Sequence, residues 1–548
     1  MIHTIDASKC TGCGTCFKTC GLDVFRLDTD QPTLSPCAAA CPAGTDMRAC
    51  NYLMQQGKRE EAAQKIMEKN PFPAITGRVC PHTCEKECSR AQVDGAVNIN
   101  ALEQYLGDFS LNDLPEKPAV RHIHKTAVAG SGPAGLSCAW YLAKAGYPVT
   151  VFESLPEPGG MLRWGIPAYR LPTAVVEAQI ARLRALGVKF VCNTTVGDKG
   201  DISLEELKNR GFKAVCLAVG ASVSRRAGIA GEDLPGVFHG LEFLRAARRN
   251  SSDKPEDVPD FPRGGRVVVV GGGDVAVDAA ITALKLGAAA VTMVCLEEKD
   301  AMPAFPHNVE DAEREGVDIL PGWGPVKIHE KTGRAAGLRV KRCLGVWDEE
   351  HRFSPRFDES DTRDLEADAV VFAIGQAGDL SFFPTLEKTS PTRLAVDPVT
   401  MNTSVWNVFA AGDAVTGPAS VIKAVRAGRE AAISMTRLLM GAHLHSEREE
   451  KRPVAEHLPG ENIRSVPRLE RTLCKTEGFA ETRRGFDDID ALNESMRCMT
   501  CGARARAAFR DDCMTCFFCE LNCPSGAITV HPFKERLPLT LESNIGGF

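Results

Sequence analysis

Cysteine is the residue type whose number and spacing point most directly to chemistry in this chain. There are 22 cysteines among 548 residues, and most lie a few residues apart within 10–20, 37–88 and 498–523. Dense disulfide frameworks belong to small secreted proteins, whereas this chain is long and opens without the basic and then apolar run of a signal peptide. The spacing is typical of metal ligands.

The first and last cysteine groups share the spacing Cys-x2-Cys-x2-Cys-x3-Cys. In bacterial ferredoxins, three cysteines of this run bind one [4Fe–4S] cluster and the fourth binds a neighbouring cluster. Gly21 stands where the run usually has proline, whereas the last group keeps Pro524. Zinc is the alternative metal, but its paired ligands are separated by longer loops. The two runs are Cys10, Cys13, Cys16 and Cys20, and Cys513, Cys516, Cys519 and Cys523.

Each run needs the fourth cysteine of the other, so we expect the two ends of the chain to meet in one split ferredoxin-like module. The alternative is two separate half-modules, each binding a cluster locally. In the split module one cluster is bound by Cys10, Cys13, Cys16 and Cys523, and the other by Cys513, Cys516, Cys519 and Cys20.

A glycine-rich loop at 130–135 predicts a dinucleotide site, because it follows an apolar strand at 125–129 and opens an apolar helix at 136–145. The glycines allow a tight turn, the approach of a pyrophosphate and close packing of helix on strand, and the helix N-terminus favours phosphate. A second strand at 149–153 ends in an acid suited to ribose hydroxyls. The expected contacts are Gly130, Ser131, Gly132, Pro133, Ala134, Gly135 and Glu153.

Several motifs together resemble the small subunit of glutamate synthase. They include Cys37-x3-Cys41-Pro, Asn70-Pro-Phe-Pro and Gly77-Arg-Val-Cys-Pro81, and the resemblance covers about residues 35–445. Relatives of that family include the N-terminal region of dihydropyrimidine dehydrogenase and the large subunit of electron-bifurcating NADH-dependent ferredoxin:NADP oxidoreductase. The resemblance implies two further [4Fe–4S] clusters, one with the ligands Cys41, Cys80, Cys84 and Glu103.

Two residues leave the ligands of that cluster open. Glu103 has the alternative of an ordinary surface carboxylate. Cys50 is either a spare helix cysteine or a rival ligand to Glu103.

The second of these clusters shows a departure from the family, which has a Cys-x2-Cys pair shortly before Cys37. Residues 21–36 contain no cysteine, and a matching pair follows a probable helix at 489–496 instead. We therefore expect the C-terminal pair to return in space and complete a cluster with Cys37, Cys88, Cys498 and Cys501. Four clusters then use 15 cysteines and Glu103.

A second strand–loop–helix–strand pattern runs from 265 to 298, and in the family this loop binds the nicotinamide cofactor. Alanine replaces the third glycine, which the fingerprint tolerates. The loop residues are Gly271, Gly272, Gly273, Asp274 and Val275, and the following strand leads to Glu297 and Glu298.

The two glutamates predict NADH, because a carboxylate accepts from free ribose hydroxyls and repels a 2′-phosphate. Family members that use NADPH usually place arginines here. The alternative is that both glutamates are solvated and that Lys299 or a more distant base permits NADPH.

The resemblance also implies two flavin-binding segments beyond the first loop. One is an irregular segment expected to wrap the flavin, and the other is a Gly-Asp pair that precedes a helix at 420–435. The implied FAD contacts are Gly160, Met161, Gly165, Ile166, Arg170, Gly412, Asp413 and Ser420.

The predicted fold is α/β, with two nested Rossmann-like dinucleotide-binding domains, a helical N-terminal iron–sulfur domain and ferredoxin-like α+β halves at the two termini. The net charge of −6 gives no electrostatic case for nucleic acid, and no apolar run approaches the roughly 20 residues of a membrane span. We expect a cytoplasmic location. The expected segments are a ferredoxin-like half (1–30), helical [4Fe–4S] domain (31–120), FAD domain (121–250 and 371–445), NAD(P)H domain (251–370), linker (446–490) and C-terminal iron–sulfur segment (491–548).

Together these features predict an iron–sulfur flavoprotein that oxidises NADH at FAD and passes single electrons through about four clusters. A flavin accepts hydride and can release electrons one at a time, so no catalytic side chain is required. No stretch remains for a substrate domain, which indicates a subunit of a larger complex with other redox subunits or a ferredoxin-like carrier as partners. Whether the flavin bifurcates electrons stays open. The alternatives are an NADPH-dependent glutamate synthase small subunit and a non-catalytic wiring hub.

Overall fold

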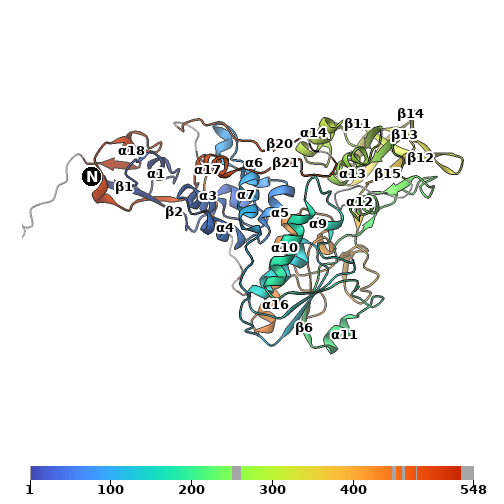
Figure 1. Cartoon of the computed structure of the whole chain (residues 1–548), viewed down its shortest axis with the longest axis horizontal. Coiled ribbons are helices and arrows are strands. Elements are labelled where there is room, and N and C mark those ends of the chain that lie inside the picture. Colours follow the sequence, from blue (N-terminus) through green and yellow to red (C-terminus); the bar gives the residue numbers. More distant parts are fainter. Residues whose placement is uncertain are drawn as a thin grey trace, which may run out of the picture.

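The computed structural model describes residues 2–249, 261–446, 448, 452–458, 463–474, 476 and 478–531. Figure 1 shows an elongated arrangement of four parts. A small module built from both ends of the chain lies at the left, and a helical domain follows it. Two nucleotide-binding domains come next, one below and one at the upper right. No helix among the described residues is long and apolar enough to cross a bilayer.

The two ends of the chain form one small module by strand pairing. Strand β1 (Ile2–Ile5) pairs antiparallel with β23 (Ile528–Val530), and β2 (Phe25–Asp28) pairs antiparallel with β22 (Arg504–Ala507). The short helices α1 (Thr15–Thr19) and α18 (Phe518–Leu521) contact each other. Buried Val24 and Phe25 pack with Ile528 and Val530. The predicted meeting of the termini is therefore present, and the predicted segment beyond 531 lies outside the described residues.

The helical domain is built from short helices and loops that carry cysteines. Residues 47–67 form two helices, separated by a turn at Gly57, whose φ is 72°. Helix α17 (Asp488–Met496) returns from the C-terminal part and contacts α3 and α7. The helices are α2 (Pro36–Ala40), α3 (Met47–Gln55), α4 (Arg59–Met67), α5 (Pro73–Val79), α6 (Thr83–Lys86) and α7 (Ile99–Leu111).

The first nucleotide-binding domain contains a parallel five-stranded sheet in the order β19-β6-β3-β4-β5. Its strands are β3 (Lys125–Ala129), β4 (Val149–Phe152), β5 (Lys189–Val191), β6 (Phe212–Leu217) and β19 (Val408–Ala410). The accompanying helices are α8 (Pro133–Lys144), α9 (Met161–Trp164), α10 (Thr173–Ala185), α11 (Leu204–Asn209), α15 (Asp413–Thr416) and α16 (Val421–Leu439).

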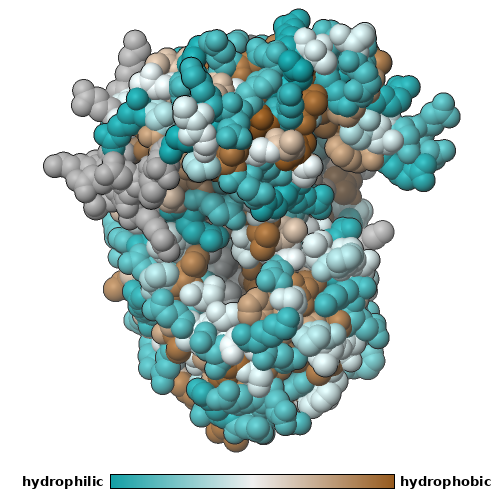
Figure 2. All heavy atoms as spheres, turned by 90° about the vertical axis from the view of Figure 1, so that its right-hand side faces the viewer, coloured by the Kyte–Doolittle hydropathy of each residue, from teal (hydrophilic) through white to brown (hydrophobic). Residues whose placement is uncertain are grey.

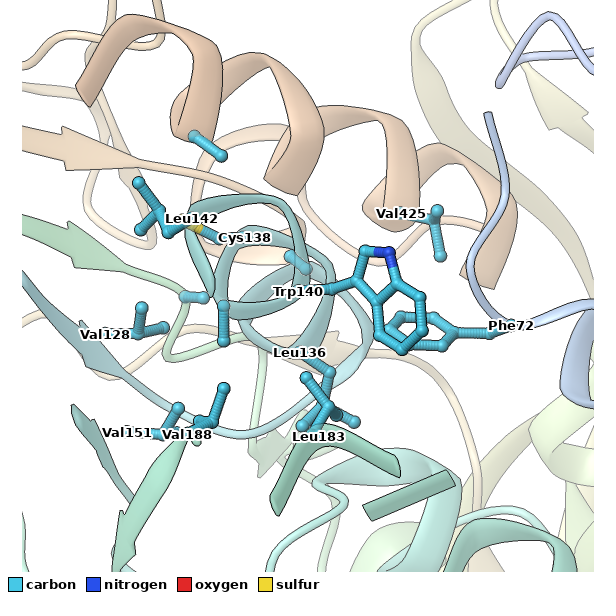
Figure 3. Packing of buried hydrophobic residues seen from close by; sticks show 14 of the residues in the cluster. Phe72, Val128, Leu136, Cys138, Trp140, Leu142, Val151, Leu183, Val188 and Val425 are labelled. Carbon is cyan, nitrogen blue, oxygen red and sulfur yellow. The ribbon is translucent and has the colours of Figure 1, made fainter. Parts of the chain in front are cut away.

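One hydrophobic core joins this domain to the helical domain. Phe72 precedes α5 and packs edge-on against Trp140 of α8, with ring centroids 6.4 Å apart. Figure 3 shows Val425 of α16 beside the same indole. Because both domains bury side chains in the same cluster, the helical domain and the first nucleotide-binding domain pack through one shared core.

The second nucleotide-binding domain contains a parallel sheet in the order β11-β10-β9-β15-β8. Strand β8 (Val237–His239) pairs with β15 (Ala369–Phe372), so the domain boundary predicted at 250 lies before Val237. Secondary-structure propensity could not predict this boundary, because β8 joins the second sheet only by pairing with β15, which comes about 130 residues later in the chain. The other elements are β9 (Arg266–Val270), β10 (Ala290–Cys295), β11 (Asp318–Pro321), α12 (Gly240–Arg249), α13 (Asp274–Lys285) and α14 (Pro306–Glu315).

An antiparallel sheet of three long strands extends this domain, and the sequence patterns did not predict it. It consists of β12 (Trp323–Lys331), β13 (Arg334–Trp347) and β14 (Phe353–Glu366). Figure 2 views the molecule from the right-hand side of Figure 1. In this view the two nucleotide-binding domains lie one above the other, and the mainly hydrophilic surface recedes where they meet. The chain crosses between them at β7 (Val223–Ser224) and β16 (Gln376–Ala377), which pair antiparallel.

The predicted linker crosses the helical domain on its way to α17. Leu34 forms an isolated parallel bridge with Val454, and Arg468 donates to the carbonyl of Ala96 at 3.0 Å. A short hairpin of β20 (Thr472–Leu473) and β21 (Arg483–Arg484) follows. Among the described residues, the remaining strands are β17 (Lys388–Ser390) and β18 (Arg393–Leu394).

Candidate redox site

The terminal module brings the first predicted ligand set around one cavity. Its wall includes Cys10, Cys13, Cys16 and Cys523. Burial raises the pKa of the Cys16 thiol, and the neighbouring Cys13, Cys10 and Cys523 raise it further. These are the four residues that the split arrangement assigns to one cluster, and a cavity between four thiols is what such a cluster would fit.

The second set of the module lies around α18. Burial raises the pKa of Cys519 to about 11, and Cys20 and Cys513 contribute to the rise, so these three lie near one another. Cys516 is exposed. This set therefore reaches the surface of the module.

A third set joins the helical domain to the C-terminal segment. Burial raises the pKa of Cys37, with further contributions from Cys498, Cys501 and Cys88. The Ser35 hydroxyl lies 3.3 Å from the sulfur of Cys37. The pair predicted to return from the C-terminal part does lie beside Cys37 and Cys88.

A buried ionic network holds that C-terminal pair in place. Arg497, directly before Cys498, donates to Glu494 Oε1 at 2.6 Å and to Asp94 Oδ1 at 2.8 Å. The side chains of Arg497 and Glu494 are 1% and 0% exposed. The Glu494 oxygens also accept the backbone N–H groups of Asn98 at 2.7 Å and Leu469 at 2.9 Å. Helix α17 is thus fixed to the helical domain by charges without access to water.

The fourth set lies deepest in the helical domain. Burial raises the pKa of Cys80, with contributions from Glu103 and Cys41, and that of Cys84, with contributions from Cys41 and Cys37. Glu103 is 8% exposed, and burial raises its pKa to about 7. Its Oε1 accepts from Asn70 at 2.6 Å and from Thr76 at 2.5 Å. A buried carboxylate held by one oxygen suits a ligand role better than a surface role.

Cys50 lies near Glu103 but in an apolar setting. It is 0% exposed and packs with Met47 and Met54 in the hydrophobic cluster of the helical domain. Burial raises its pKa, with a small contribution from Glu103. Its part in the cluster stays an open prediction.

The four sets follow one another from the tip of the molecule to the flavin domain. The Lys18 ammonium, on the helix between Cys16 and Cys20, donates to the carbonyl of Cys498 at 2.6 Å, which joins the terminal module to the third set. Cys37 and Cys84 join the third set to the fourth. Cys80 and Ala43 pack on Ile422 in the first turn of α16.

Among the described residues, the cysteine sets do not have the geometry of a site for a single metal ion. Across the residues that the structure describes, no three His, Cys, Asp or Glu side chains lie close enough to bind one metal ion. A [4Fe–4S] cluster is larger than an ion, and its ligands stand further apart around it.

The first glycine loop has the geometry of a dinucleotide cradle. A Cβ at Gly135 would lie 2.0 Å from the carbonyl oxygen of Gly130, so the helix packs directly on the turn. A Cβ at Gly132 would meet no atom within 4 Å, which leaves the space that a pyrophosphate needs. Pro133 and Ala134 begin α8, so the N-terminus of this helix adjoins the loop.

Glu153 reaches this loop from the end of β4. It is 5% exposed, and its Oε2 accepts from the backbone N–H of Ser131 at 2.9 Å and from its hydroxyl at 2.5 Å. Its Oε1 accepts from Leu155 at 2.9 Å. The acid therefore lies beside the loop and shapes the turn, and its contact with a ribose stays a prediction.

The two other predicted flavin segments meet the same loop. A Cβ at Gly160 would lie 2.6 Å from the Cα of Gly132, and one at Gly412 would lie 2.8 Å from Ala134 Cβ. Met161 begins α9 and its methyl group lies against Gly165, with Ile166 next in the chain.

Two polar groups of these segments fit a bound flavin. The Ser420 hydroxyl, at the N-cap of α16, is buried without a hydrogen-bond partner in the structure. Burial raises the pKa of Asp413 to about 6. An orphaned hydroxyl and a partly buried carboxylate beside the loop suit the polar chain of a dinucleotide.

Arg170 has a partner that the sequence did not indicate. One of its guanidinium nitrogens lies 2.8 Å from both carboxylate oxygens of Asp278 on α13, and the Tyr169 hydroxyl donates to the carbonyl of Asp278 at 3.2 Å. The predicted flavin segment is therefore tied to the second nucleotide-binding domain. In the sequence, Asp278 was marked only by being a charged residue inside a largely apolar helix.

The second glycine loop repeats the cradle. A Cβ at Gly273 would meet no atom within 4 Å, whereas one at Gly271 would lie 2.4 Å from the carbonyl oxygen of Ala373. Asp274 begins α13 and accepts from Asn308 at 2.7 Å, and Val275 follows it.

Glu297 and Glu298 lie just after β10 and point to different partners. A Cβ at Gly272 would lie 2.9 Å from Glu297 Oε2, so this carboxylate lies against the loop. Glu298 instead pairs with Arg342 of β13 at 2.7 Å. The sequence did not single out Arg342, because the pairing depends on the three-stranded sheet.

Comparisons with known proteins agree with this geometry. Residues 124–428 match the family "pyridine nucleotide-disulphide oxidoreductase". Residues 31–114 match "dihydropyrimidine dehydrogenase domain II, 4Fe-4S cluster", and residues 3–26 match "4Fe-4S binding domain".

Three curated relatives are each 35% identical to the chain. One is the NADP(+)-dependent formate dehydrogenase subunit beta of Moorella thermoacetica, matched over 85% of this chain and 70% of that protein. The NAD-dependent dihydropyrimidine dehydrogenase subunit PreT of Escherichia coli (strain K12) is matched over 74% and 92%. The glutamate synthase [NADPH] small chain of Halomonas elongata is matched over 72% and 86%.

The predicted resemblance and the predicted fold class are thereby confirmed. The family matches support FAD, NAD(P) and [4Fe–4S] as the cofactors of an oxidoreductase. The chain belongs to the pyridine nucleotide-disulphide oxidoreductase family, as an NAD(P)H-dependent flavoprotein that carries added [4Fe–4S] domains.

Proposed function

We propose that this chain is an electron-transfer subunit that oxidises NADH at FAD and delivers single electrons at its terminal module. The order of the four ligand sets carries the proposal: it leads from Ile422 on α16, through the helical domain, to the exposed Cys516. Bound flavin supplies the change from two-electron to one-electron chemistry. The side chains of the chain bind, orient and insulate the cofactors.

Each cofactor has its own holding residues in this proposal. The first loop with Glu153, Asp413 and Ser420 binds FAD, and the second loop with Glu297 binds the nicotinamide nucleotide. The Arg170–Asp278 pair keeps the two domains in register, so that nicotinamide and flavin face each other. The four ligand sets hold about four [4Fe–4S] clusters, with Glu103 completing the set nearest the flavin.

Preference for NADH is supported by the position of Glu297. A carboxylate that lies against the loop accepts hydrogen bonds from the ribose hydroxyls of NADH and repels the 2′-phosphate of NADPH. The relatives include proteins named for NADP and one named for NAD, so the family alone does not decide the choice.

The partner in this proposal is another redox subunit or a ferredoxin-like carrier. The relatives named above are subunits or chains of larger enzymes. Exposed Met514, Phe518 and Leu521 surround the outer ligand set and offer an apolar contact there.

The test separates electron entry from electron delivery. The variant Cys516→Ala should keep rapid flavin reduction by NADH under anaerobic conditions, while its reduction of an added ferredoxin falls at least tenfold. Cys192→Ala is the matched control, since Cys192 lies outside every ligand set and should change neither rate. Equal ferredoxin reduction by Cys516→Ala and the parent protein would refute delivery through the terminal module.

A further inference from the structure

The rim of the second nucleotide loop carries an arginine that the proposed function does not use. Arg342 reaches Glu298 Oε1 at 2.7 Å. Its place is fixed by the backbone: Gly322 donates to the carbonyl of Glu297 at 2.9 Å, and Cys343 donates to the carbonyl of Gly322 at 2.8 Å. The guanidinium is therefore tethered beside the acidic end of β10.

The ion pair itself is weak, but the position of the guanidinium does not depend on it alone. The side chains of Arg342 and Glu298 are 35% and 64% exposed, and pairs of such exposure contribute little. Arg342 also lies over the Trp323 ring, 5.8 Å from its centroid, and Arg363 lies over the same ring at 4.2 Å. An indole platform keeps an arginine in place when its carboxylate partner leaves.

The two glutamates therefore have different surroundings. Glu297 lies against the loop at Gly272, where ribose hydroxyls would come. Glu298 points to Arg342, and a Cβ at Gly322 would lie 2.8 Å from Glu298 Oε1 and 3.0 Å from the Arg342 guanidinium carbon. Lys299, the nearest other base in sequence, pairs with Glu313 at 2.6 Å.

We propose that Arg342 forms an anion subsite for the 2′-phosphate of NADP(H), and that Glu298 occupies this subsite and so disfavours that nucleotide. Arginine binds phosphate through charge-assisted, bidentate hydrogen bonds, which a freed guanidinium supplies. Discrimination then comes from a removable carboxylate rather than from the lack of a cation. This inference rests on the proposed nucleotide site at Gly271–Gly273.

The test measures binding without turnover, using NAD⁺ and NADP⁺ as probes, which differ only in the 2′-phosphate. Isothermal titration of the FAD-loaded protein compares the parent chain with Glu298→Gln. The variant should bind NADP⁺ roughly tenfold more tightly or better, with NAD⁺ affinity unchanged. Added salt should reduce the gain, because it depends on charge.

Two further variants make the result specific. Glu298→Gln combined with Arg342→Gln should lose the gain. The control Glu350→Gln removes the charge of a glutamate of similar exposure, which pairs with Arg352 at 2.9 Å in the turn between β13 and β14, and should change nothing.

Each other outcome overturns a defined claim. Three results would overturn the subsite. The first is an unchanged preference between the two nucleotides in Glu298→Gln, and the second is a gain in NADP⁺ affinity that persists when Arg342 is also replaced. The third is a loss of NAD⁺ affinity in Glu298→Gln as large as the gain in NADP⁺ affinity. Failure of every protein, the parent included, to bind either nucleotide would overturn the proposed function itself.

Discussion

Replacement of Arg497 by methionine should release one iron–sulfur cluster without disturbing the rest of the protein. The change keeps most of the side-chain volume but removes the charge that Glu494 faces at 2.6 Å. Since Glu494 is 0% exposed, its carboxylate would stay buried with only the backbone donors of Asn98 and Leu469. Breaking a buried ion pair on one side costs about 3–5 kcal/mol.

That cost falls on the contact between α17 and the helical domain, which places Cys498 and Cys501. At about 1.4 kcal/mol for each factor of ten, the opened state becomes roughly a hundred- to several thousandfold more populated. The assay is the anaerobic rate at which a chelator removes iron, expressed per FAD. In Arg497→Met, one cluster's worth of iron should leave at a rate increased by about that factor.

The control breaks a pair that links the same helix to the same domain at the surface. Arg59 and Asp488 lie 2.9 Å apart with side chains 34% and 74% exposed, so loss of this pair in Arg59→Met should destabilise the contact far less than loss of the buried pair. Arg497→Met combined with Glu494→Gln should recover much of the loss, because no unpaired charge remains in that pair. Similar iron loss in the Arg497 and Arg59 variants would show that the buried pair does not hold Cys498 and Cys501 in place.

Gly12→Ala should detach the C-terminal segment from the first cysteine run, because the new Cβ would lie 1.9 Å from the carbonyl oxygen of Ala503 and the backbone has a φ of 70°. The iron content per FAD should fall. A normal iron content would contradict close packing of Gly12 on Ala503. Gly21→Ala, whose Cβ would meet no atom within 4 Å, is the matched control and should keep full iron. For Asp413, whose pKa is raised to about 6 by burial, FAD binding to the deflavinated protein should weaken below pH 6, by up to about tenfold per pH unit. The sign follows because the ionised carboxylate accepts hydrogen bonds from ribityl hydroxyls more strongly than the protonated acid does. Asp413→Asn should flatten the pH profile in a fluorescence titration, and an unchanged slope would rule out this carboxylate.

Local patterns predicted the elements whose function depends on nearby residues. The two glycine loops, their strands and their helices appear close to the predicted ranges, since turn geometry and helix packing are written within about thirty residues. The meeting of the termini was also predictable, because the cysteine spacing of each run leaves one ligand to be supplied by the other.

Features set by distant contacts were not predictable in the same way. The sequence indicated neither the sheet of β12, β13 and β14 nor the assignment of β8 to the second domain. The strand β14 is largely charged and exposed, so it lacks the alternation that marks a half-buried strand. Arg342 and Asp278 follow from the same cause, because each acquires its partner only when separate segments pack together.

Electron entry from NADH can be tested by an anaerobic titration of the iron-replete protein. NADH and NADPH are added separately while the absorbance of flavin and clusters is followed. We expect rapid bleaching of both chromophores by NADH and little response to NADPH, because Glu297 lies against the second glycine loop and Glu298 pairs with Arg342. Preferential bleaching by NADPH, or bleaching by neither nucleotide in protein that retains FAD, would contradict it.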